Sequence, residues 1–214
     1  MIDRSVQFFQ DGGIFMWPLL ACAVLGLIII VWKFFSLTST SSRTKALLQD
    51  VDGLIANQRL DEAKARCRDS DTPVAQILLA GLEKHQEGTD RVLTAIENEG
   101  MIQMSRLESG LVWLATIANV APLLGFLGTV AGMIIAFGAI ELAGEVDATL
   151  VAGGIKVALI TTAAGLTIAI PVNIAHNYFV SKIDSMVIEM EETSQNLVET
   201  LHEMGRQPAP QPRA

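Results

Sequence analysis

Two threonines, Thr129 and Thr162, have the side chains and the setting in this sequence that most suggest a function. Each lies in the middle of a long apolar stretch. Because successive residues of a helix are rotated by about 100°, each also lies on a helix face whose other residues are small. The first stripe comprises Ala118, Pro122, Gly125, Thr129, Gly132 and Ala136. The second comprises Gly154, Ala158, Thr162, Gly165 and Ala169, with Asn173 close beside it. Hydroxyls on such faces could line a path for ions.

Close helix packing is the alternative explanation of these stripes. Small residues four apart let two transmembrane backbones approach each other, and a threonine can hydrogen bond within its own helix. Neither stretch has an acid or a histidine at its middle, and a hydroxyl does not store a proton at neutral pH. If protons move here, we expect the titrating carboxylate to come from another protein.

Lys156 is a charged residue near the outer end of the second stripe. A lysine at such a place can extend its amine to the membrane surface, where Glu145 or Asp147 would be its partner. We favour this interpretation over a role of Lys156 in gating.

The composition predicts an all-α membrane protein. Half of the 214 residues are hydrophobic, mean hydropathy is +0.42, and three apolar stretches cover 13–35, 111–142 and 148–180. About 20 residues suffice to cross a bilayer core of ~30 Å. The second and third stretches exceed that length, so we expect three transmembrane helices whose last two extend into an aqueous helical domain.

A cleaved leader is the competing interpretation of the first stretch. Leu19 to Cys22 resembles a lipoprotein cleavage site. The acids Asp3 and Asp11 in the head, and the apolar residues that continue beyond Cys22, favour an uncleaved span instead.

The residues between the spans predict further helices. Residues 36–110 form an expected helical domain, which begins with a Ser/Thr-rich linker at 36–44. In this domain Thr72 and Pro73 are typical of an N-cap and first helical residue. A helix that opens at Asp90 should continue without a break into the second span. An amphipathic helix is expected over 181–204 and a disordered, proline-containing tail over 205–214.

The basic residues predict the topology. Lysines and arginines concentrate in 36–110 and recur after the third span, whereas the short loop at 143–147 carries only acids. By the positive-inside rule, residues 36–110 and the C-terminus are cytoplasmic, and the head at 1–12 and the loop are outside.

Several classes of function are disfavoured by the remaining residues. The net charge of −8 argues against nucleic-acid binding. Cys22 and Cys67 lie in unlike segments, and the three histidines are scattered, so we expect neither a disulfide framework nor a metal site. A solute transporter is disfavoured because the three spans contain no inverted repeat. No catalytic residue and no cofactor is expected.

Three segments resemble the helix motifs of the MotA/TolQ/ExbB proton-channel family. Residues 121–133 read APLLGFLGTVAGM and resemble its second-helix motif, and residues 154–166 read GIKVALITTAAGL and resemble its third. Residues 13–20, GIFMWPLL, resemble the entry to its first helix and favour ExbB within the family. Three spans with a short acidic loop are also more similar to ExbB and TolQ than to MotA, which has four spans.

The resemblance implies a homopentamer in the inner membrane. Its pore would enclose the transmembrane helices of an ExbD- or TolR-like single-span partner that bears the proton-carrying aspartate. Proton flow would energise a TonB-like protein and so drive outer-membrane transport, with Thr129 and Thr162 as the functional threonines. A TolQ-like envelope-maintenance motor, a gliding-type motor and a non-conducting scaffold remain alternatives.

One departure from the family pattern concerns Val157, which stands where many ExbB and TolQ proteins have a glutamate. A proton relay through that glutamate therefore does not apply to this chain.

Overall fold

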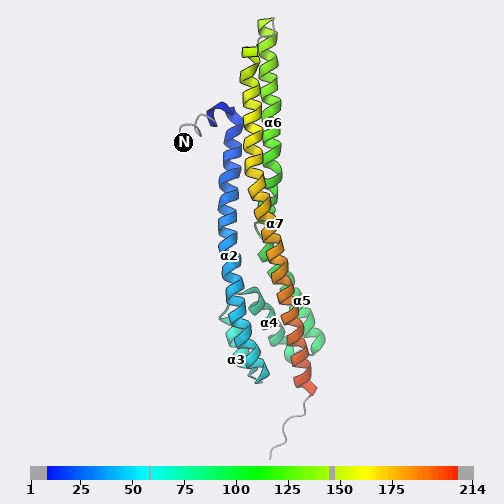
Figure 1. The fold of residues 1–214 in the computed structure, drawn as a ribbon. Coiled ribbons are helices and arrows are strands. Elements are labelled where there is room, and N and C mark those ends of the chain that lie inside the picture. Colours follow the sequence, from blue (N-terminus) through cyan, green and yellow to red (C-terminus); the bar gives the residue numbers. More distant parts are fainter. Residues whose placement is uncertain (1–8, 58, 145–147, 207–214) are drawn as a thin grey trace, which may run out of the picture. The chain divides into compact units, whose positions relative to one another are not determined.

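The computed structural model describes residues 9–57, 59–144 and 148–206, and these residues are almost entirely helical, with no strand among them (Figure 1). The helices, in chain order, are η1 Gly13–Phe15, α2 Met16–Ala56, α3 Leu60–Arg68, α4 Pro73–Lys84, η2 His85–Glu87, α5 Thr89–Glu108, α6 Leu111–Ala143 and α7 Ala148–Arg206. The all-α prediction is confirmed.

Three segments of the described chain are long and apolar enough to cross a membrane: Gly13–Ile55, Thr89–Ala143 and Val151–His202. Large apolar side chains on them are widely exposed, such as Ile28 on α2, Phe126 on α6 and Leu159 on α7. Such exposure is favourable in the hydrocarbon core of a membrane and unfavourable in water. Three spanning helices, the last two long, are therefore confirmed.

The chain divides into two compact units. The first combines Met1–Lys33 with Gly110–Phe179 and contains the apolar parts of α2, α6 and α7. A core cluster in this unit joins the three helices through Met16, Leu19, Ala121, Ile160 and Ala169. The second unit combines Phe34–Ser109 with Val180–Ala214 and contains most of the charged residues.

The second unit is organised around α4. The Thr72 hydroxyl accepts a hydrogen bond from the Ala75 amide, and Pro73 is the first helical residue, as predicted. At Gly81 an added Cβ would lie 2.9 Å from Ile96 Cδ1 and 3.0 Å from Leu197 Cδ2. The missing side chain at Gly81 therefore lets α5 and α7 pack closely against α4.

The predicted linker at 36–44 is wrong, because α2 continues through it without a break. The hydroxyls of Thr38, Thr40 and Thr44 each donate a hydrogen bond to the carbonyl four residues earlier. Since these polar groups are satisfied inside the helix, a Ser/Thr-rich composition did not require an irregular segment.

The predicted uninterrupted helix from Asp90 is also wrong. Helix α5 ends at Glu108, and α6 begins at Leu111 after Gly110, whose φ of 88° is left-handed. Glycine adopts this conformation without strain, which explains the break.

The C-terminal segment predicted as an amphipathic helix is part of α7, and this helix also includes Gly205 and Arg206 from the expected tail. Residues 1–8 of the head, 145–147 of the loop and 207–214 of the tail lie outside the described residues.

Burial of Cys67 on α3 leads to a chemical prediction. Burial raises the pKa of the Cys67 thiol from 9.0 to about 11, because the thiolate would lose its hydration. In a Cys22→Ser variant, which leaves one thiol, we expect maleimide to alkylate the folded protein at pH 8 about 100-fold more slowly than the denatured protein.

The raised pKa of Cys67 also determines how the stability of the fold depends on pH. Below pH 9.0 the thiol is protonated in both states, and the stability associated with the raised pKa is fully present. That stability declines as the pH rises from 9.0 through about 11. Equal alkylation rates in the folded and denatured protein would contradict a buried Cys67.

Candidate functional site

Glycines bring the backbones of α6 and α7 into direct contact in the first unit. A Cβ at Gly125 would lie 2.9 Å from the Thr161 carbonyl oxygen, and one at Gly132 would lie 2.6 Å from the Gly154 carbonyl oxygen. A Cβ at Gly165 would lie 2.6 Å from the Ala121 carbonyl oxygen. No side chain fits at these positions without moving the helices apart. We call this contact the α6–α7 seam.

The predicted small residues Gly125, Gly132, Ala158 and Gly165 are all buried in the seam or against it. Within one chain, the close-packing explanation of the stripes therefore accounts for these four residues. The buried face of α6 is also rotated from the predicted stripe, since it includes Ala121 and Gly128.

Thr162 connects the two helices. Its hydroxyl donates a hydrogen bond of 3.2 Å to the Gly125 carbonyl oxygen, across the seam. Thr129 differs, because its hydroxyl donates to the Phe126 carbonyl oxygen of its own helix at 2.6 Å. The sequence pattern predicted the same role for both threonines. In the structure, Thr162 bridges the two helices and Thr129 lies at the edge of the seam.

Thr161 is a seam residue that sequence reasoning missed. It is completely buried, and its hydroxyl lies 3.0 Å from both the Val157 and Ala158 carbonyl oxygens. A Cβ at Gly128 would overlap the Thr161 side chain, so the glycine makes room for it. Both residues lie outside the predicted stripes, and no pattern in the sequence links Gly128 to Thr161.

The remaining predicted residues lie elsewhere on α7. Asn173 is exposed and Val157 is partly buried. Between Leu111 and Ile140, and between Val157 and Ala175, the two helices contain no acid and no histidine. The described part of the chain also contains no cluster of side chains that could hold a metal ion.

Lys156 forms an ion pair that the sequence did not indicate. Its Nζ lies 2.6 Å from Asp11 Oδ2, and both side chains are partly exposed. The partners expected for it, Glu145 and Asp147, lie outside the described residues. Next to Asp11, a Cβ at Gly12 would lie 3.0 Å from Ile160 Cγ2, so the segment before α2 lies against α7 at two successive positions.

These features define the chain as a multi-pass helical membrane protein in which two long spans with no acid at their middle pack backbone to backbone. Residues 69–192, more than half of the chain, match the model of the MotA/TolQ/ExbB proton channel family. The chain belongs to this family and is a multi-pass inner-membrane protein.

Relatives named ExbB and TolQ both match. A putative biopolymer transport protein ExbB homolog of Methanothermobacter thermautotrophicus is 30% identical over 187 residues, 87% of this chain and 66% of that protein. Biopolymer transport protein exbB1 of Vibrio cholerae is 33% identical over 179 residues, 79% of this chain and 76% of that protein. The Tol-Pal system protein TolQ of Pseudomonas aeruginosa is 34% identical over 130 residues, 56% of each chain. The chain thus spans just under two thirds of the length of the Methanothermobacter protein.

The seam predicts different effects for two glycine substitutions. Gly165→Ala places a methyl group against the Ala121 carbonyl and should destabilise the protein by about 1–3 kcal/mol, as overpacking does. Gly138→Ala on α6 is the matched control, because a Cβ there meets nothing within 4 Å. Thermal unfolding in detergent, followed by circular dichroism, measures both variants. Equal stability of the two would mean that the seam is not closely packed.

Proposed function

We propose that this chain is the proton-channel subunit of an inner-membrane motor complex that couples the proton motive force to TonB-dependent outer-membrane transport. The observation that carries the proposal is the Thr162 hydroxyl, which lies at the contact of two spans that have no acid at their middle. Membership of a proton-channel family and the match to proteins named ExbB support it.

The proposed chain works as part of an assembly. Hydroxyls can accept and donate hydrogen bonds along a path, but a carboxylate is needed to take up and release the proton. We assign that carboxylate to an ExbD- or TolR-like single-span partner enclosed by a homopentamer of this chain. Each proton that crosses 100 mV releases about 2.3 kcal/mol, enough to bias a conformational step passed to a TonB-like protein.

In this proposal the N-terminus is periplasmic and the C-terminus cytoplasmic, as the distribution of basic residues favours. The chain binds no cofactor and catalyses no covalent reaction. Thr129, Thr162 and Asn173 lie along the proton pathway, while Gly125, Gly132, Ala158 and Gly165 shape it by setting how closely α6 and α7 approach. Lys156 supplies a charge at the outer end, balanced by Asp11.

Two other candidates have specific support. The match to TolQ of Pseudomonas aeruginosa supports a Tol-type envelope motor. A non-conducting scaffold is supported by the seam, because backbone contacts at Gly125 and Gly165 suffice to explain the small residues.

Thr162→Val separates a conducting subunit from a scaffold. Valine has nearly the same shape but no hydroxyl, so we expect partner-dependent, energised uptake to be lost. One interhelical hydrogen bond in a membrane contributes about 0.6 kcal/mol on average, so the oligomer should stay assembled. The measurements are substrate uptake by a host whose own ExbB is deleted, with the partner co-expressed, and the mass of the purified complex.

Thr161→Val is the matched control for that experiment. It removes the hydroxyl of the adjacent residue, which bonds within α7, and we expect uptake to be retained. Normal uptake by Thr162→Val would exclude the pathway role of Thr162. Equal loss in both variants would indicate a packing defect and support the scaffold.

Because the proposal assigns the carboxylate to a partner, it predicts that this chain alone does not conduct protons. Purified and reconstituted in liposomes with a pH-sensitive dye, it should give little proton flux under an imposed potential, because its paired spans have no acid or histidine at their middle. Adding the single-span partner should raise the flux well above that of empty liposomes. Strong flux from the chain alone would contradict the assignment.

A further inference from the structure

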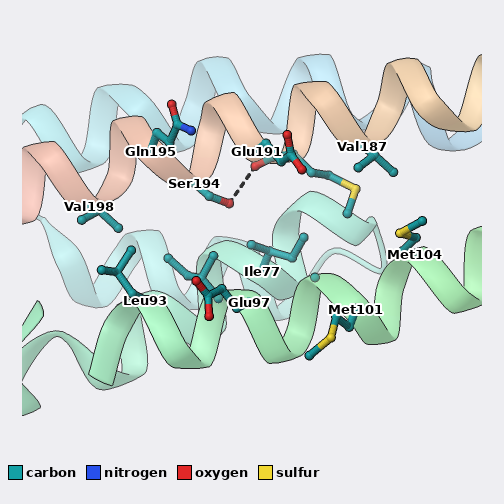
Figure 2. Close-up of a pocket in the computed structure, with 13 residues that line it drawn as sticks. Ile77, Leu93, Glu97, Met101, Met104, Val187, Glu191, Ser194, Gln195 and Val198 are labelled. Carbon is teal, nitrogen blue, oxygen red and sulfur yellow. Dashed lines mark hydrogen bonds between the residues drawn. The ribbon is translucent and has the colours of Figure 1, made fainter. Parts of the chain in front are cut away.

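A groove of about 700 Å³ opens between α5 and α7 in the second unit, with Ile77 of α4 also lining it (Figure 2). At Gly100 on α5 an added Cβ would meet no atom within 4 Å, so the groove is open above this residue. The Ser194 hydroxyl donates to the Met190 carbonyl at 2.7 Å, which turns its polar group towards its own helix.

The walls of the groove are apolar and deformable. Met101 is 64% exposed, and Met104 and Leu93 are each 41% exposed, although α5 belongs to the charged unit. Met190 lines the opposite wall. Exposed apolar side chains gathered in one groove are typical of a binding surface, and methionine adapts its shape to varied partners.

Two carboxylates give the groove its charge. Glu97 of α5 and Glu191 of α7 lie on opposite walls, and no lysine or arginine is among the lining residues that the structure describes (Figure 2). Neither carboxylate forms an ion pair with another described residue. An occupant must therefore offer an apolar strip with positive charges on both sides of it.

We propose that this groove binds a basic amphipathic helix of a partner protein. The apolar stripe of such a helix would cover the methionines, and its flanking lysines or arginines would pair with Glu97 and Glu191. A second copy of this chain is a poorer occupant, because acids outnumber basic residues on its helix α5, where Asp90, Glu97, Glu99 and Glu108 stand against Arg91 and Arg106. The inference goes beyond the proposed function and does not depend on proton conduction.

The test uses a fluorescent peptide of about 18 residues, roughly five helical turns, with leucines and lysines arranged as an amphipathic helix. Fluorescence anisotropy measures its binding to the full chain in nanodiscs of zwitterionic lipid, with empty nanodiscs as background. We expect saturable binding that a peptide of the same composition in scrambled order, or with glutamate in place of lysine, does not show.

Charge variants locate the binding site. The double variant Glu97→Gln with Glu191→Gln should weaken binding by about tenfold, the range expected for two exposed ion pairs. Glu192→Gln is the matched control: it removes the same charge one residue away, outside the groove, and should change the affinity less than about twofold.

Gly100→Leu tests the groove itself. A Cβ at this position meets no atom within 4 Å, and leucine has a higher helix propensity than glycine, so the fold should be retained, as circular dichroism can verify. Peptide binding should then be lost. Equal binding by the scrambled peptide, or no effect of the groove variants, would overturn the proposal in favour of general charge attraction. A smaller oligomer mass in Gly100→Leu with unchanged peptide binding would instead assign the groove to a second copy.

Discussion

The contact between the backbones of α6 and α7 is the constraint on which the first unit depends. In a membrane the hydrophobic effect does not hold helices together, so their association relies on dispersion contacts and hydrogen bonds at close range. Glycines at 125, 132 and 165 leave space for the facing helix, and any Cβ there would meet a backbone atom. The same approach allows the Thr162 hydroxyl to reach the Gly125 carbonyl oxygen.

Close packing also limits what the small residues can do. A residue buried between α6 and α7 does not face water at the same time, so the lining of any pathway would fall to residues at the edge of the seam. Thr129 and Thr162 both meet this condition, since both are partly exposed: the Thr129 hydroxyl bonds within its own helix, and the Thr162 hydroxyl bonds across the seam. Packing and conduction are therefore compatible explanations that apply to neighbouring residues.

The sequence predicted the features that local patterns encode. Hydropathy located the three spans, and helical spacing located the stripes that contain Gly125 and Thr162. It did not predict Thr161 as a seam residue, because a rotation of the buried face by a fraction of a turn depends on the partner helix. Nor did it predict the ion pair of Lys156 with Asp11, since no periodicity links residues so far apart in the chain.

The two units of the chain differ in how charge is distributed. The spans of the first unit have no carboxylate at their middle, where an ionised group is costly. The second unit has the opposite character: it is rich in acids, and two of them flank an apolar groove without a basic partner among the residues that the structure describes. Under the two proposals made above, a partner supplies a carboxylate in the membrane and a basic, apolar segment outside it. Because they belong to different units, one partner protein could supply both only if it had a spanning helix and an aqueous segment.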